Sequence, residues 1–121
     1  MTDKQPPKLV FAPSYGEQDA RESESKGYCD RARAEYSDGS FIPLVFYDPV
    51  RLKEDVRLLS EGGRKFLGNP GLIVVKRVTQ EYMERALEGV HRERFFDNLV
   101  RLPPGSRLDQ RNTIASIPSD D

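Results

Sequence analysis

The sequence predicts an α+β fold: a small two-layer domain in which a mixed β-sheet carries two helices on one face. Three observations indicate this class. Short apolar runs are typical of strands, an Asp-Gly pair joins two of these runs as in a hairpin, and two later segments have the spacing of amphipathic helices. The predicted order of elements is β-β-β-α-β-α, and Leu99–Leu102 is a candidate for a last short strand.

The chain is expected to form one domain. Its 121 residues suffice for one modest core. We expect the domain to span residues 8–102, between a flexible N-terminus at 1–7 and a disordered C-terminal tail at 103–121. Both end segments are polar and contain prolines, so they offer little to bury.

Two strands are predicted before the hairpin turn. Lys8–Ala12 is a short apolar run, and Gly27–Tyr36 has two unlike faces. The segment between them, Ser14–Lys26, is polar and shows no apolar periodicity, so we expect a long loop there. The faces of the second strand are expected to hold Tyr28, Ala32, Ala34 and Tyr36 on one side, and Cys29, Arg31, Arg33 and Glu35 on the other.

The hairpin turn is predicted at Ser37–Ser40. Asp38-Gly39 tolerates the positive φ angles of a two-residue turn. The return strand, Phe41–Tyr47, is apolar on both faces, which is typical of a strand that is covered on both sides. Because Pro43 has no N–H to donate, one side of this strand should be unpaired or bulged at that position.

Two helices are predicted in the second half of the chain. The first begins after Asp48, whose carboxylate can accept hydrogen bonds from the first free N–H groups, and ends at Gly62-Gly63. The second is capped by Thr79 and extends roughly from Gln80 to Arg94.

Leu72–Val75 is a fully apolar run between the two helices, as expected for an interior strand. A strand–helix–strand connection makes it parallel to Phe41–Tyr47, with a right-handed crossover. We expect Phe95-Phe96 to fold back onto the core, and a dimer partner is an alternative cover for part of the sheet.

The composition narrows the classes of function. The 20 acidic and 19 basic residues give a net charge of −1, unlike the basic balance of a typical nucleic-acid-binding domain. A single cysteine allows no internal disulfide, which favours a reducing, cytoplasmic compartment. No apolar run approaches the roughly 20 residues needed to cross a bilayer. We therefore expect a cytoplasmic protein that makes no contact with a membrane.

The sequence contains no recognisable catalytic, cofactor or metal site. The only histidine, His91, and the only cysteine, Cys29, cannot build a structural zinc site within one chain. The segment Gly62-Gly63-Arg64-Lys65 follows a helix, whereas a phosphate-binding loop would open one. A Cys29-dependent enzyme or redox sensor is the weakest hypothesis, based on Arg31 and Arg33, which would lower the pKa of the thiol if they lie close. We expect a non-enzymatic protein without a cofactor.

Two hypotheses of function remain. The first is that the protein binds another protein, as an immunity or accessory factor, or itself as a homodimer, because Tyr and Arg are enriched at binding hot spots. The alternative is a weak RNA- or DNA-binding module that uses arginines to contact phosphates and tyrosines as surfaces on which bases stack. The candidate partner-binding residues are Tyr28, Arg31, Arg33, Glu35 and Tyr36. The candidate nucleic-acid patch is Arg31, Arg33, Arg64, Lys65, Lys76 and Arg77.

Overall fold

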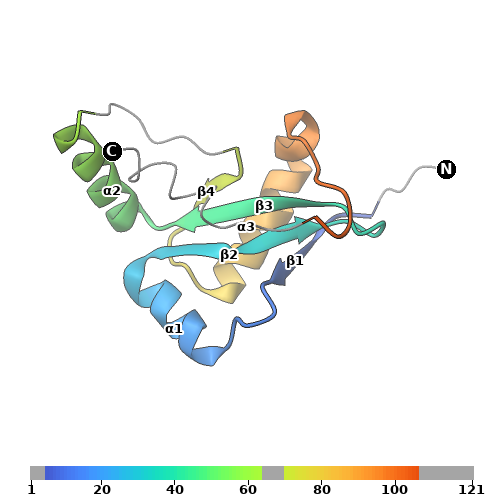
Figure 1. Cartoon of the computed structure of the whole chain (residues 1–121), viewed down its shortest axis with the longest axis horizontal. Helices are drawn as coiled ribbons and strands as arrows, with labels where there is room; N and C mark the ends of the chain where they lie inside the picture. Colours follow the sequence, from blue (N-terminus) through green and yellow to red (C-terminus); the bar gives the residue numbers. More distant parts are fainter. Residues whose placement is uncertain (1–4, 64–69, 107–121) are drawn as a thin grey trace.

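A computed structural model of the chain describes residues 5–63 and 70–106 (Figure 1). The predicted α+β class is confirmed, since the described residues form a four-stranded mixed sheet and three α-helices. The parts of the predicted flexible ends at 1–4 and 107–121 lie outside the described residues. The elements are β1 (Lys8–Phe11), α1 (Glu17–Lys26), β2 (Tyr28–Glu35), β3 (Phe41–Tyr47), α2 (Pro49–Glu61), β4 (Leu72–Val74), α3 (Gln80–Arg92) and the 3₁₀ helix η1 (Phe95–Asn98).

The strands follow the order β1-β2-β3-β4 across the sheet. β2 pairs antiparallel with β1 and β3, and β4 runs parallel to β3 after the α2 connection, as predicted. Pro43 lies in β3 before Val45, the first residue that pairs with β4. The Tyr36 N–H donates to the Ser40 oxygen, and hydrogen-bonded and non-bonded pairs alternate along an antiparallel hairpin. Pro43 is opposite Arg33, which makes this a non-bonded pair, so the nitrogen of Pro43 points away from β2 and toward the β4 side. The predicted unpaired side at Pro43 is therefore confirmed.

The main core lies between the sheet and α3, which crosses behind the strands in Figure 1. The apolar stripe of α3 and Phe96 of η1 are both buried in this core. The sequence predicts an amphipathic helix here and a return of Phe95-Phe96 onto the core. Its strand residues alternate along each strand, as a sheet face requires. The principal members are Cys29, Ala32, Ala34, Ile42, Leu44, Phe46, Ile73, Met83, Leu87 and Phe96.

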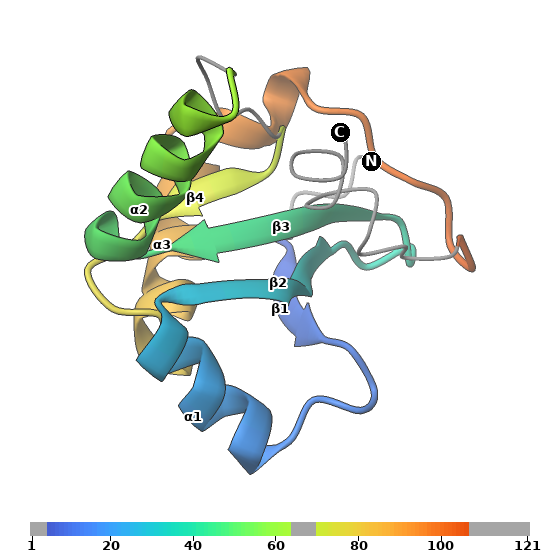
Figure 2. The ribbon, with the colours of Figure 1, turned by 60° about the vertical axis from the view of Figure 1, so that its left-hand side comes forward.

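Helices α2 and α3 do not lie on the same face of the sheet, where the two predicted helices were expected. Tyr47 follows Phe46 in β3 and points to the opposite face, where its hydroxyl donates to Asp55 of α2 over 2.8 Å. α2 therefore contacts the face that α3 does not cover. Figure 2 shows α1 and α2 at the end of the sheet where β2 begins and β3 ends. The division follows from β3 itself, whose two apolar faces both need cover.

Helix α1 occupies most of the segment that was predicted as a long loop, so that prediction is wrong. Its residues are polar, and only Ser23 is buried, so the sequence carries no apolar periodicity to indicate it. Contacts at its ends stabilise the helix. The Asp19 carboxylate accepts a hydrogen bond from the Gly16 N–H over 2.8 Å, and Gly27 ends the helix in the left-handed conformation with φ of 73°.

A β-bulge in β2 changes the predicted faces of this strand. The register with β3 shifts between Cys29 and Ala32. Cys29 consequently joins Ala32 in the core, while Tyr28 packs edge-on against Tyr47 of the other face, with ring centroids 5.0 Å apart. The prediction that Tyr28 shares a face with Ala32 is wrong, because a bulge adds one residue to the alternation.

The predicted helix caps are confirmed. The Asp48 carboxylate accepts from the Arg51 N–H over 2.8 Å, and the Thr79 hydroxyl accepts from the Tyr82 N–H over 3.3 Å. Helix α2 ends at Glu61 with Gly62 as its C-cap, as expected, whereas α3 ends at Arg92, slightly earlier than predicted.

Two predictions at the ends of strands need correction. The hairpin turn is longer than the expected two residues, because hydrogen bonds from the Tyr36 N–H to the Ser40 oxygen (2.8 Å) and from the Gly39 N–H to the Tyr36 oxygen (2.9 Å) enclose residues 37–39. Residues 99–102 form no strand, and only Leu102 makes an isolated bridge, to Phe41.

None of the helices among the described residues has the length and apolar composition that a bilayer crossing requires.

Candidate functional site

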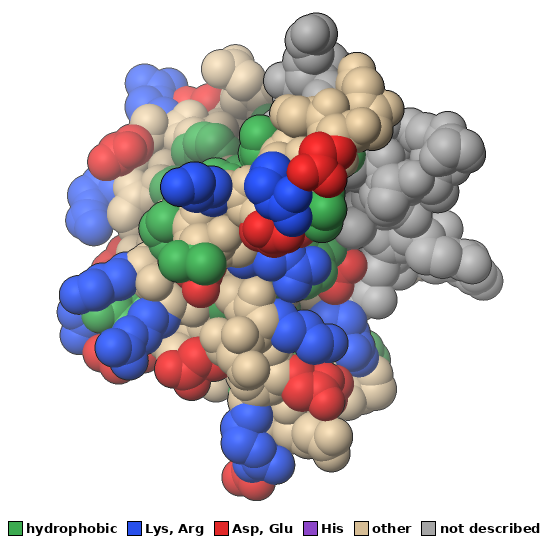
Figure 3. All heavy atoms as spheres, turned by 90° about the vertical axis from the view of Figure 1, so that its left-hand side faces the viewer, with side chains coloured by type: hydrophobic (Ala, Val, Ile, Leu, Met, Phe, Trp, Pro, Cys, Tyr) green, Lys and Arg blue, Asp and Glu red, His purple; other side chains and the backbone are tan. Residues whose placement is uncertain are grey.

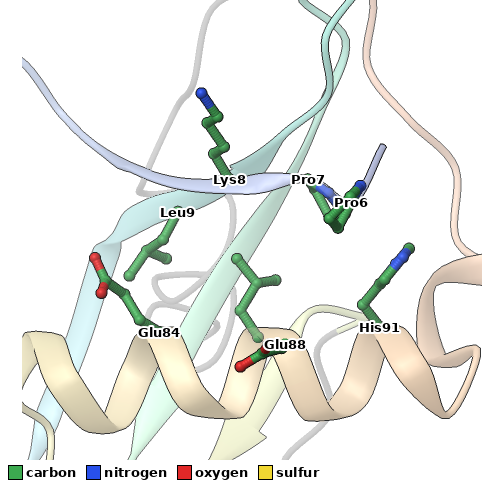
Figure 4. A pocket seen from close by; sticks show the side chains of 8 residues that line it. Pro6, Pro7, Lys8, Leu9, Glu84, Glu88 and His91 are labelled. Atoms are coloured by element: carbon green, nitrogen blue, oxygen red, sulfur yellow. The ribbon is translucent and has the colours of Figure 1, made fainter. Parts of the chain in front are cut away.

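A groove of about 400 Å³ separates the edge strand β1 from helix α3 (Figure 4). We call it the β1–α3 groove. Leu87, a buried residue of α3, also lines it. The volume of the groove falls within the range of about 300–1,000 Å³ that is common for binding pockets. One wall contains Pro6, Pro7 and Leu9, and the other contains Glu84, Glu88 and His91.

The two walls follow from strand and helix periodicity. Leu9 pairs with Ala34, a core residue, so the side chain of Leu9 points to the face that α3 covers. Glu84, Glu88 and His91 are spaced four and three residues apart, which places them on one side of α3. In Figure 4, Leu9 and Glu84 point toward one another across the groove, whereas Lys8 points away from α3.

The outer edge of β1, next to the groove, carries main-chain hydrogen-bonding groups that point away from β2. β1 is an edge of the sheet, and no strand among the described residues pairs with its outer side. The Ala12 N–H donates to the Arg31 oxygen over 2.9 Å in the same register that joins Lys8 to Glu35. Because bonded and non-bonded pairs alternate in an antiparallel ladder, the N–H and C=O groups of Leu9 and Phe11 face away from β2.

The α3 wall carries negative charge that no cation of the described residues neutralises through an ion pair. The Glu84 carboxylate accepts a hydrogen bond from the neutral Gln80 amide over 3.0 Å. Within residues 5–63 and 70–106, Glu84 and Glu88 make no ion pair, and Glu88 and His91 make no hydrogen bond. Both carboxylates are exposed, so they can meet the side chains of a bound molecule.

A second hollow of about 530 Å³ adjoins the groove, because His91 lines both. Tyr36 and Arg101 form part of its wall. The Arg101 guanidinium lies 3.5 Å from the centroid of the Tyr36 ring and donates to the Ser40 hydroxyl over 3.3 Å. Burial raises the pKa of Tyr36, and the Arg101 cation partly opposes this shift. The second hollow therefore offers an aromatic surface beside a fixed cation.

The predicted partner-binding residues do not form one face. Tyr28 and Arg31 line a small hollow of about 140 Å³ between α1 and β2. Arg31 lies 3.5 Å from Asp19 and also contacts the Ser14 hydroxyl. Tyr36 is buried and lines the second hollow, beside the β1–α3 groove.

The remaining two members, Arg33 and Glu35, bind one another. Their ion pair measures 2.7 Å, and the Arg33 guanidinium stacks over the Phe41 ring at 4.4 Å. Both side chains are about 30% exposed, at 29% and 31%. Much of their capacity for charged contacts is therefore already used within the sheet.

The predicted nucleic-acid patch is divided. Arg31 and Arg33 are paired with carboxylates, as described above, while Lys76 and Arg77 are exposed on the loop between β4 and α3. Arg64 and Lys65 lie outside the described residues. On the face formed by α1 and α2, basic and acidic side chains are interspersed (Figure 3). There Arg57 of α2 pairs with both Glu54 and Glu61.

Cys29 lies in the core rather than in an accessible site. It is 2% exposed, and burial raises the pKa of its thiol. The Cys29 Sγ atom lies 4.0 Å from the Tyr15 hydroxyl. The pKa of the thiol is therefore not lowered by Arg31 and Arg33 as the redox hypothesis expected, and an unreactive thiol is favoured. Among the described residues, no three His, Cys, Asp or Glu side chains gather as metal ligands would.

The β1–α3 groove could not be recognised from the sequence. Glu84, Glu88 and His91 are visible in the sequence as one side of a helix, but such a set is usually a solvated surface. Their importance depends on β1 lying beside them, and β1 is far away in the chain. Comparisons with protein-family models, with curated proteins and with solved structures found no match.

Proposed function

We propose that this protein binds another protein, and that the β1–α3 groove receives an extended segment of the partner as an added strand. The observation that carries the proposal is the outward-facing main chain of Leu9 and Phe11 beside the groove. In strand addition, main-chain hydrogen bonds supply affinity, and pockets for alternate side chains supply specificity.

The short length of β1 limits the free energy of binding that an added strand can gain. Two residues with outward N–H and C=O groups offer up to four hydrogen bonds, each with a net contribution of about 0.5–1.5 kcal/mol. Leu9, Pro6 and Leu87 add apolar contacts. Such a contact is small, so we expect a transient complex rather than an obligate one.

A second copy of the chain is a less favourable occupant. Symmetric pairing of β1 with β1 of another molecule would bring the two α3 helices together along the new seam. Glu84 and Glu88 of each copy would then face the same carboxylates of the other, and like charges in apposition disfavour association. The homodimer therefore has less support than a different partner.

A nucleic acid also has less support. The α3 wall of the groove is acidic, and a phosphate backbone would meet Glu84 and Glu88 there. Two arginines of the predicted nucleic-acid patch, Arg31 and Arg33, are already paired with carboxylates.

The proposal is tested by two substitutions at one position. Peptides are selected from a random displayed library on the wild-type protein, and their dissociation constants are measured for Leu9→Ala and Leu9→Pro. Both variants lose the leucine side chain, but only proline removes the outward N–H and obstructs the edge. We expect Leu9→Pro to weaken binding at least tenfold relative to Leu9→Ala.

Both variants should remain folded, because the Leu9 N–H makes no bond to β2 in this register; thermal unfolding checks this. As a contrast, Val10→Pro removes an N–H that faces β2 and should lower the melting temperature more. Selected peptides that bind Leu9→Ala and Leu9→Pro equally, or a library that yields no binder, would overturn the proposal.

A further inference from the structure

We infer that the segment bound in the β1–α3 groove carries basic side chains at alternate positions, in a Lys/Arg-x-Lys/Arg pattern that meets Glu84 and Glu88. This inference rests on the proposed strand addition and adds the chemistry of the partner. Three features of the groove lead to it: unpaired charge, spacing along α3, and the direction of Lys8.

The first feature is charge. Glu84 and Glu88 both line the groove and are exposed, and neither has a cationic partner in the described part of the chain. The three acidic residues of α2, by contrast, are all paired with arginines of the same helix: Glu54 and Glu61 with Arg57, and Asp55 with Arg51. A basic side chain from a partner would supply the missing counter-charge.

The second feature is spacing. Glu84 and Glu88 are four residues apart on α3, which corresponds to a rise of about 6 Å along the helix axis. Side chains two residues apart on an extended strand share one face and lie about 6.6 Å apart. β1 and α3 run side by side along the groove in Figure 4, so a strand added to β1 runs beside Glu84 and Glu88. Basic residues at positions i and i+2 would then match the two carboxylates.

The third feature concerns the residue between the two bases. It would point to the opposite face of the sheet, the side to which Lys8 points. Lys8 is exposed and makes no ion pair within the described residues. A third positive charge there would meet Lys8, so the intervening residue should not be basic. The pattern is therefore alternating rather than a continuous basic run.

The test uses synthetic peptides of matched composition. The probe is acetyl-Thr-Val-Lys-Val-Lys-Val-Thr-amide. One control, acetyl-Thr-Val-Lys-Lys-Val-Val-Thr-amide, holds the same residues with adjacent lysines, and another replaces both lysines of the probe by glutamate. Dissociation constants come from NMR titration of the wild-type protein, of Glu84→Gln/Glu88→Gln, and of Glu17→Gln/Glu24→Gln. The last variant removes equal charge from α1, which does not line the groove.

We expect the alternating peptide to bind the wild type about tenfold more tightly than Glu84→Gln/Glu88→Gln, since two exposed ion pairs contribute roughly threefold each. Glu17→Gln/Glu24→Gln should bind like the wild type, and the preference should shrink as salt rises. Equal binding of the alternating, adjacent and glutamate peptides would overturn the inference.

The outcome separates the inference from the function on which it rests. If library peptides lose binding in Leu9→Pro but the lysine peptides show no preference, strand addition stands and the basic pattern is wrong. If the alternating peptide depends on Glu84 and Glu88 but not on the Leu9 N–H, the charge contact stands, and strand addition is wrong.

Discussion

Replacing Gly71 with alanine should destabilise the fold by about 3 kcal/mol or more, because the added methyl group has no space. A Cβ atom at this position would lie 2.1 Å from the Pro43 carbonyl oxygen and 3.2 Å from the Leu44 Cα. Both neighbours belong to the backbone of β3, so a side-chain rotation cannot relieve the overlap. The Gly71 oxygen also accepts a hydrogen bond from the Val45 N–H over 3.0 Å, which begins the pairing with β4.

The matched control for this substitution is Gly89→Ala. Gly89 lies inside α3, and an added Cβ would meet no atom within 4 Å. This change should stabilise the protein by about 0.5–1 kcal/mol, since alanine favours the helix over glycine. Urea unfolding of both variants measures the difference. A Gly71→Ala protein as stable as the wild type would show that β4 does not approach β3 so closely.

Replacing Gly27 with alanine should lower the stability by about 2–3 kcal/mol, through two separate effects. The left-handed conformation, with φ of 73°, costs an alanine about 1–2 kcal/mol. The new Cβ would also lie 2.5 Å from the Oδ2 atom of Asp48. Asp48 caps α2, so its displacement removes a contact whose loss typically costs about 1 kcal/mol.

Gly63→Ala separates these two effects. Gly63 also has a positive φ of 94°, but an added Cβ would have nothing within 4 Å. It should therefore show only the conformational cost, and the excess in Gly27→Ala reports the collision with Asp48. Equal losses of unfolding free energy in the two variants would mean that the cap on α2 moves aside freely.

The fold could be predicted where burial leaves a pattern in the sequence. β3 is apolar on both faces, and both faces are covered; α3 has an apolar stripe, and Met83 and Leu87 are buried. Asp48 and Thr79 could be recognised as caps because their chemistry is local. Helix α1 could not, since it buries only Ser23 and thus carries no stripe.

The candidate site could not be predicted, because it is made of contacts between distant parts of the chain. The tyrosines and arginines of the hairpin are residue types common at binding sites, which is why the sequence predicted a site there. The bulge in β2 and the ion pairs of Arg31 and Arg33, however, depend on the three-dimensional structure. Glu84 and Glu88 resemble any exposed helix surface until β1 is known to lie alongside. The edge position of β1 is a property of the sheet order, which a single sequence does not reveal.

Hydrogen exchange of the main-chain amides tests the central claim most directly. Exchange is followed by NMR for the free protein and with a saturating amount of a library-selected peptide. Leu9 and Phe11 should exchange at least tenfold more slowly in the complex, because their outward N–H groups become bonded to the added strand. Leu72 and Val74, which face the opposite edge of the sheet, should be unchanged. A peptide that binds without protecting Leu9 and Phe11, or that protects Leu72 and Val74 instead, would contradict strand addition at β1.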